Sequence, residues 1–341
     1  MANEMINPFD VDGFNMTSLC AAVNILPNMY GRVGQLGLFT PDGITTRTAV
    51  VEEQNGILNL IKTQPVGAPG VYSKIGKRKV RSFVVPHIPL PDKIMPEEFQ
   101  GLRAFGQTNV LEQLAAVMQK HLQTGKNKFA ITLEHLRMGA LKGIILDADI
   151  SEIYNLYTEF GITAKTVDFA LSASPATDVP AKCREVVRHI EDNLKGEVMT
   201  GVRCLVSAEF FDALIKHEKV LKFYENHAAM LQFVTGADPR KGFNFAGVTF
   251  EEYRGIATDE DGNSRRFIAS GEGHCFPEGT MNTFKNVYAP GNFIETTNTP
   301  GIELYAKQAT EVMGRWVDLW MESNPLPLCL RPAVLVKVTV S

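Results

Sequence analysis

The hydrophobic pattern changes between helical and strand-like periods along the chain. Apolar residues recur at helical spacing over 108–142 and over 178–195. The stretches 44–61, 79–88 and 333–340 instead contain β-branched residues or alternate apolar with other positions, which is typical of strands. Because these elements do not follow one another as regular strand–helix–strand units, the pattern predicts an α+β fold.

The strongest helix signal lies at 108–142. Thr108 can act as its N-cap, and Gly125 makes a break in the middle possible. If continuous, the helix is about 50 Å long at ~1.5 Å per residue, enough to form the backbone of an elongated domain. Its apolar positions are Val110, Leu111, Leu114, Val117, Met118, Leu122, Phe129, Leu133, Leu136, Ala140 and Leu141.

Shorter elements follow this helix. Residues 178–195 form a second predicted helix, with Pro180 in its first turn. A buried strand is predicted at 202–206, and Ser207 is suited to cap a helix over 208–217. Two hairpins are also expected: one over 144–157, and one in which 248–253 and 265–268 flank the turn 259–263.

A basic ribbon is predicted near the start of the chain. The strands at 44–61 and 79–88 are joined by a glycine-containing segment, which suggests an extended hairpin with a mobile tip. From Gln54 to Pro91 there are six basic residues and no acid, whereas the whole chain has a net charge of -4. Two-stranded ribbons are marginally stable alone, so this one needs a surface to rest on. Contact with a partner subunit is favoured over contact with nucleic-acid phosphates or simple solvation.

Composition narrows the function. The chain has 341 residues, of which 45% are hydrophobic, and its small net charge argues against a dedicated nucleic-acid binder. Its five cysteines form no CxxC pair, so reduced thiols in an intracellular, soluble protein are expected. No apolar run is long enough to span a membrane. HExxH, GxSxG and P-loop motifs are absent. We therefore predict no catalytic, cofactor or metal site.

The apolar residues of 1–43 are too numerous for a disordered tail, so this segment is expected to lie on its own domain or on a neighbouring subunit. An apolar arm, a long ribbon and the lack of an enzymatic motif together favour a self-assembling protein.

Several long strings resemble the lambda-type major capsid protein family of tailed bacteriophages, also called the phage capsid protein E family. They run through nearly the whole chain: NPFDVDGFNMTSLCAAVNILPN (7–28), YGRVGQLGLF (30–39), KRKVRSFVVPHIP (77–89), NKFAITLEHLRMGALKGIILDAD (127–149), LYTEFGIT (156–163), RHIEDNLKGEVMTGV (188–202), GEGHCFPEGT (271–280) and ESNPLPLCLRPAVLVKV (322–338).

The resemblance implies the capsid fold first described for phage HK97. Its expected parts are an N-terminal arm (1–43), an extended loop or E-loop (44–92), a peripheral domain (93–177) with the spine helix at 108–142, an axial domain (178–280), a return to the peripheral domain (281–329) and a C-terminal strand (330–341).

The resemblance also implies a structural function. Copies of the chain would form hexamers and pentamers that close into an icosahedral head around double-stranded DNA, first as a procapsid and then as an expanded shell in the virion. Assembly in the host cytoplasm would involve a scaffold protein, a portal at one vertex, a small decoration protein and non-specific contact of DNA with the inner surface. An encapsulin-like compartment, which shares the fold, and an unrecognised enzyme are the alternatives.

The predicted intersubunit site combines the two lines of reasoning. The basic residues of the ribbon are expected to meet acids on an adjacent subunit, and charge reversal at Lys77 and Arg78 should then impair shell formation without unfolding the subunit. The basic set is Lys74, Lys77, Arg78, Lys79 and Arg81, and the candidate acids are Glu97, Glu98, Glu251 and Glu252.

Overall fold

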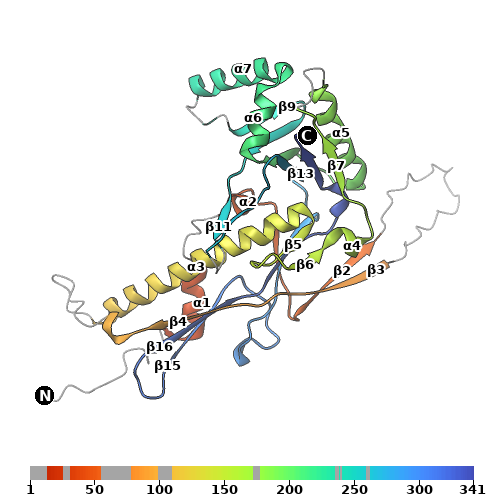
Figure 1. Cartoon of the computed structure of the whole chain (residues 1–341). Helices are drawn as coiled ribbons and strands as arrows, with labels where there is room; N and C mark the ends of the chain where they lie inside the picture. Colours follow the sequence, from red (N-terminus) through yellow and green to blue (C-terminus); the bar gives the residue numbers. More distant parts are fainter. Residues whose placement is uncertain are drawn as a thin grey trace, which may run out of the picture.

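The computed structural model describes residues 14–25, 31–54, 78–98, 110–171, 177–234, 238, 240–258 and 262–341. A long helix crosses the middle of the molecule (Figure 1). A six-stranded sheet and the helices that cover it lie beyond one end of this helix. Smaller sheets run alongside the helix. The mixture of parallel and antiparallel strands with separate helices gives the α+β class that the pattern predicts.

The central helix is α3 (Val110–Lys142), which confirms the prediction from residue 110 onward, while Thr108 lies outside the described residues. Gly125 does not break it. A Cβ atom at this position would collide with the Met321 Cε atom, so glycine here lets a neighbouring strand pack closely against the helix. The buried stripe of α3 comprises Met118, Leu122, Phe129, Ala130, Leu133, Leu136, Met138, Ala140 and Leu141.

The six-stranded sheet has the order β7-β18-β13-β8-β10-β9. Its strands are β7 (Lys165–Asp168), β18 (Val336–Thr339), β13 (Glu272–Glu278), β8 (Gly201–Val206), β10 (Val248–Glu252) and β9 (Lys241–Phe245). The strand predicted at 202–206 is thus confirmed as β8. The last strand is shorter than the predicted 333–340, because a 3-10 turn, η4 (Pro332–Val334), precedes β18. In this turn the backbone N–H of Val334 donates to the Arg331 carbonyl.

Three helices accompany this sheet: α5 (Val179–Leu194), α6 (Ala208–Lys216) and α7 (Glu218–Val234). The first two confirm the predictions at 178–195 and 208–217. As predicted, Ser207 caps α6, because its hydroxyl accepts a hydrogen bond from the Phe210 N–H. The hydrophobic pattern predicted no element for α7, which follows α6 after a single residue, His217.

One predicted hairpin is wrong in its strand pairing, and the other is confirmed with a shorter second strand. β10 pairs with β8 and β9 inside the large sheet, so it does not pair across the turn at 259–263. That hairpin is formed by β11 (Ile256–Thr258) and β12 (Ser264–Arg266). The other is formed by β5 (Ile144–Leu146) and β6 (Glu152–Asn155) and is shorter than expected, because the Asn155 side chain caps a helical turn, α4 (Leu156–Phe160).

The remaining strands form two small sheets and the predicted ribbon. One sheet has the order β1-β14-β17, with β1 (Thr40–Gly43), β14 (Phe284–Tyr288) and β17 (Pro325–Cys329). The other has the order β15-β16-β4, with β15 (Tyr305–Thr310), β16 (Val317–Ser323) and β4 (Ile88–Ile94). The ribbon consists of β2 (Thr48–Gln54) and β3 (Arg78–Val84). Its second strand is shorter than the predicted 79–88, because Ile88 already begins β4, and residues 55–61 of the predicted first strand lie outside the described residues. The short helices are α1 (Met16–Ile25), α2 (Arg32–Gln35), η2 (Pro96–Glu98) and η3 (Ile294–Thr296).

Two hydrophobic clusters hold these layers together. The larger joins the six-stranded sheet to one end of α3 and to the base of the ribbon. The smaller lies where α1 and the β15-β16-β4 sheet pack against the other half of α3. Helix α1 is also fixed by Lys126 of α3, whose buried Nζ donates to the Val23 and Asn24 carbonyls at 2.9 and 3.2 Å. The segment 14–25 therefore lies on its own subunit.

A close crossing of two backbones gives a test of this packing. Gly301 lies over β14, where a Cβ atom would collide with the Tyr288 carbonyl oxygen. We expect Gly301→Ala to lower the free energy of unfolding by about 1–3 kcal/mol, because neither backbone can move away freely. Gly201→Ala is the matched control, because a Cβ there meets no atom within 4 Å. Equal urea midpoints for the two variants would contradict the close packing.

Candidate intersubunit site and buried ionic network

The ribbon has one anchored face and one exposed face. Ala49 and Phe83 point inward and are almost fully buried, and the Phe83 ring packs edge-on against Tyr154 at 5.2 Å. On the opposite face Val50, Val80 and Val84 are each 62% exposed. Figure 1 shows the ribbon leaving the body of the molecule beside α4. The ribbon thus presents an apolar surface that its own subunit does not cover.

The structure separates the predicted basic residues. Lys74 and Lys77 lie outside the described residues, as does the side chain of Arg78. Lys79 is exposed. Arg81 is engaged within its own subunit: its guanidinium carbon lies 4.4 Å from the centre of the Phe160 ring, and its Nε donates to the Glu159 carbonyl at 2.8 Å. Arg81 therefore helps to hold the base of the ribbon.

The predicted acids lie in two different places. Glu97 and Glu98 are exposed on η2, directly after β4. Glu251 and Glu252 lie on β10 in the six-stranded sheet. The Glu252 carboxylate lies 3.7 Å from Arg240 and 3.9 Å from Arg254, both well exposed. The Glu251 side chain is only 3% exposed, so it has no surface to offer to a neighbouring subunit.

Glu98 takes part in a clamp around His121 of α3. The imidazole Nδ1 lies 2.7 Å from Asp92 Oδ2, and its Nε2 lies 2.7 Å from Glu98 Oε2. Since both partners are carboxylates, the ring satisfies both contacts only as a doubly protonated imidazolium. The clamp fixes β4 and η2 to the middle of α3. Two further charged residues, Lys120 and Lys128, line the same pocket of about 280 Å³.

The clamp should make stability depend on pH. Burial alone lowers the pKa of His121, but its bonds to Asp92 and Glu98 outweigh burial and raise it above 6.5. The contribution of His121 to the free energy of unfolding is therefore complete below pH 6.5, and it is lost as the pH rises through the raised pKa. The Met95 N–H and His121 lower the pKa of Glu98 below 4.5, so its contribution is lost only in stronger acid.

We accordingly expect the melting temperature of the wild-type subunit to exceed that of His121→Asn near pH 6. The difference between the two melting temperatures should become smaller as the pH rises to about 8.5, because the wild-type imidazolium loses its proton. Thermal melts of both proteins across this range measure the effect. His189→Asn serves as a second comparison, because among the described residues the His189 ring contacts the Ala333 carbonyl and the Asn193 amide rather than a carboxylate. A gap that stays constant with pH would contradict the clamp.

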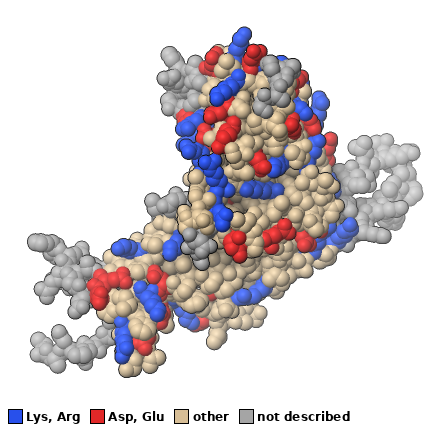
Figure 2. Space-filling view, viewed as in Figure 1, with Lys and Arg blue, Asp and Glu red and all other residues tan. Residues whose placement is uncertain are grey.

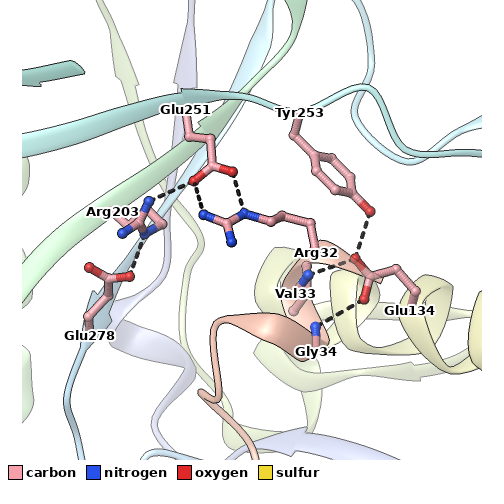
Figure 3. A network of polar contacts seen from close by, with 8 residues as sticks. All are labelled: Arg32, Val33, Gly34, Glu134, Arg203, Glu251, Tyr253 and Glu278. Atoms are coloured by element: carbon pink, nitrogen blue, oxygen red, sulfur yellow. Dashed lines mark hydrogen bonds and ion pairs between the residues drawn. The ribbon is translucent and has the colours of Figure 1, made fainter. Parts of the chain in front are cut away.

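Glu251 is the centre of a buried ionic network (Figure 3). Arg32 of α2 binds it with two hydrogen bonds, from Nε at 2.6 Å and Nη2 at 3.1 Å. Arg203 of β8 donates to the same carboxylate from Nη1 at 2.6 Å and binds Glu278 of β13 through Nε. Such paired, hydrogen-bonded charges are costly to separate once they are buried.

A second buried carboxylate extends the connection to α3. Glu134 accepts hydrogen bonds from the backbone N–H groups of Val33 and Gly34 at 2.7 and 3.2 Å and from the Tyr253 hydroxyl at 3.0 Å. Burial and the negative charge of Glu134 raise the pKa of Tyr253, so the phenol stays protonated and donates. Figure 3 shows α2 lying between the two carboxylates. Helix α2 therefore links the central helix to the six-stranded sheet.

Sequence patterns alone did not identify Arg32, Glu134, Arg203 or Glu278. A signal for two of them was present. Arg203 interrupts the apolar run Val202–Val206, and Glu134 interrupts the apolar stripe of the long helix. A charge in such a place is usually paired. Its partner could not be read from the sequence, because Arg32 and Glu251 are 219 residues apart.

Other features of the described residues bear on function. They contain no group of three or more histidine, cysteine or acidic side chains suited to hold a metal ion. Among the same residues, no helix is both long enough and apolar enough to cross a membrane. All five cysteines are buried, and none of them takes part in a disulfide in this structure. On the face shown in Figure 2, acidic and basic side chains are mixed, without one broad field of a single sign.

Comparison with known proteins identifies the family. The profile of the phage major capsid protein E family matches residues 15–340. The chain belongs to this family. The major capsid protein of Pseudomonas phage KPP10 is 32% identical, over 96% of this chain and 97% of that protein. The major capsid protein of Salmonella phage Felix O1 is 30% identical, over 98% of each.

Solved structures agree with the family assignment at the level of fold. A protein assigned to the capsid of a prophage in E. coli CFT073 superposes with a TM-score of 0.58 at 18% identity, covering 96% of this chain and 99% of that one. The capsid of Ralstonia phage GP4 gives a TM-score of 0.52 at 10% identity, covering 89% and 87%. The expected HK97-like capsid fold of the family is thereby confirmed.

Proposed function

We propose that this chain is the major capsid protein of a tailed phage and that its copies form hexamers and pentamers of an icosahedral head. The observation that carries the proposal is the family match over residues 15–340, together with capsid relatives that align over nearly their full lengths. The two curated relatives are phage major capsid proteins, which favours a DNA-filled head over an encapsulin-like compartment. The chain then has a structural role rather than an enzymatic one.

The proposed division of labour follows the fold. The ribbon β2–β3 acts as the E-loop, α3 as the spine helix, and the six-stranded sheet with α5–α7 as the axial domain. This sheet also takes β7 and β18, so the axial domain would draw on segments on both sides of 178–280. The proposed segments are the arm 1–43, the loop 44–92, the peripheral segments 93–177 and 281–329, the axial segment 178–280 and the C-terminal strand 330–341.

Contacts between subunits would begin at the ribbon. Residues 48–84 contain six basic and two acidic residues, while the chain as a whole is acidic. We infer that the ribbon's exposed valines meet an adjacent subunit together with the basic residues of the sequence segment 74–79, which are Lys74, Lys77, Arg78 and Lys79. Glu97 and Glu98 of that subunit are candidate acids. Each contact can be weak, because a closed shell engages many of them at once.

Further partners belong to the same proposal. A scaffold protein would guide the procapsid in the host cytoplasm, a portal would occupy one vertex, and a decoration protein would bind the expanded shell of the virion. Packaged DNA would touch the inner surface without sequence specificity, and the small net charge of -4 suits a weak contact of this kind.

Electron microscopy tests the proposal directly. The protein is expressed alone and together with the scaffold gene of its own genome, and the products are imaged after negative staining. Closed shells, tubes or free capsomers are the expected products, and the shell diameter would then limit the triangulation number. A monodisperse monomer or dimer under both conditions would overturn the proposal.

A further inference from the structure

Three of the five cysteines lie in the hydrophobic core that the six-stranded sheet shares with α5. Cys204 of β8 and Cys275 of β13 stand directly opposite each other in the antiparallel register. Their sulfur atoms are 2.6 Å apart, and both side chains are fully buried. The third, Cys183 of α5, is also fully buried and close enough to act electrostatically on Cys204.

The backbone geometry suits a covalent bond between the opposed pair. Directly opposed residues in antiparallel strands have Cα atoms about 4.5–5.5 Å apart. A disulfide spans about 4.4–6.8 Å between Cα atoms, so the two strands need not move. The sulfur atoms already lie much nearer than in an ordinary contact between two thiols. A small rotation of the two side chains would bring them to bonding distance.

Neighbouring groups do not offer the thiols another role. Among the described residues, no three or more histidine, cysteine or acidic side chains are arranged to hold a metal ion, and this applies also to Cys183, Cys204 and Cys275. Burial raises the pKa of Cys183 to about 12 and that of Cys204 well above 9. The thiols of Cys183 and Cys204 therefore stay protonated in the closed sheet. Because Cys204 and Cys275 are fully buried, reaction with an oxidant requires the strands to open transiently.

We propose that Cys204 and Cys275 form an intrachain disulfide when the protein leaves a reducing compartment and meets a low-molecular-weight disulfide such as oxidised glutathione. One thiolate attacks the glutathione disulfide and releases one glutathione thiolate. The second thiolate attacks the protein sulfur of this mixed disulfide and releases the other. The two protons of the protein thiols end on two reduced glutathione molecules, so atoms and electrons balance.

The bond would close a long segment of the chain. α6, α7 and β9 to β12 all lie between its ends. Cross-linking a loop of this length restricts the unfolded chain, so the oxidised subunit should melt roughly 5 °C or more above the reduced one. The sheet would thus be locked after synthesis without any change of fold.

Peptide mapping of the wild-type protein tests the proposal. The reduced protein is treated with oxidised glutathione in its folded state and, separately, during refolding, where burial presents no barrier. Free thiols are then alkylated in denaturant, and the protein is digested without reductant for mass spectrometry. The expected result is one linked pair of peptides containing Cys204 and Cys275, with Cys20, Cys183 and Cys329 alkylated.

Two outcomes would overturn the proposal: five alkylated cysteines under both conditions, or a link that joins Cys183 to either partner. Cys329→Ala is the control variant, because Cys329 is buried outside the sheet, on β17, and its loss should leave the link intact. The measurement uses the isolated subunit, so its result does not depend on whether shells form.

Discussion

A subunit carrying Lys77→Glu and Arg78→Glu is expected to fold normally and to yield roughly tenfold fewer shells, or none. Two positive charges become negative on a ribbon that is proposed to meet acids of a neighbour, and opposed like charges cost enough to shift association by at least that factor. The effect multiplies because every subunit in a shell repeats the contact. Electron microscopy and sedimentation of the assembly reaction measure the yield.

The control for this experiment keeps the charge and changes the side chains, as Lys77→Arg with Arg78→Lys. It should assemble like the wild type if charge rather than shape decides the contact. Arg81 stays unchanged in both proteins because it packs on Phe160 inside its own subunit. Higher salt should weaken the difference between the two variants, since screening acts on exposed charges. A normal shell yield from the charge-reversed subunit would refute the proposed contact.

Glu251→Ala should destabilise the subunit more than the loss of its neighbour Glu252, whose arginine partners are exposed. It leaves Arg203, which is 17% exposed, with Glu278 alone, and it leaves Arg32 without its bidentate partner. Removal of one member of a buried ion pair typically costs about 3–5 kcal/mol. Because Arg203 keeps one partner and Arg32 is 38% exposed, we expect a loss of about 2–4 kcal/mol in the free energy of unfolding.

The adjacent residue provides the matched comparison. Glu252→Ala removes the same chemical group from the same strand. The Glu252 side chain is 9% exposed, but its arginine neighbours are 53% and 73% exposed and lie 3.7 and 3.9 Å away, so both arginines remain solvated without it. Its loss should cost less than about 1 kcal/mol. Urea unfolding of the unassembled subunits compares the two. If Glu251→Ala is no more destabilising than Glu252→Ala, the buried network does not hold α2 to the sheet.

The sequence predicted those elements that depend on local pattern. The stripe from Met118 to Leu141 defines α3 regardless of what packs on it, and the β-branched residues of 48–51 and 80–84 define the ribbon. Strand partners were harder to predict. Phe250 of β10 is opposite Cys204 in one neighbour and Phe243 in the other, whereas the sequence suggested a hairpin with 265–268. Such pairings depend on the whole sheet rather than on the nearest turn.

The intersubunit site could likewise be predicted only in part. The concentration of basic residues in the ribbon can be read directly from composition. Whether a given charged side chain is free to contact another subunit cannot be read from the sequence, because this depends on distant residues. Arg81 is bound to Glu159 and Phe160 of α4. Glu251 is bound to arginines 48 and 219 residues away. The contacts of His121 with Asp92 and Glu98 could not be predicted for the same reason, because these acids are 29 and 23 residues away in the sequence.

The position of β18 has a consequence for biosynthesis. It lies inside the six-stranded sheet, parallel to β7 on one side and antiparallel to β13 on the other. On the ribosome, residues 336–339 emerge after both neighbours. At about 5–20 residues per second, roughly 10–30 s separate the synthesis of β7 from that of its partner. During that interval β7 has no neighbour in this sheet, so a nascent subunit cannot complete it. Association that requires a finished sheet must wait until translation has passed residue 339.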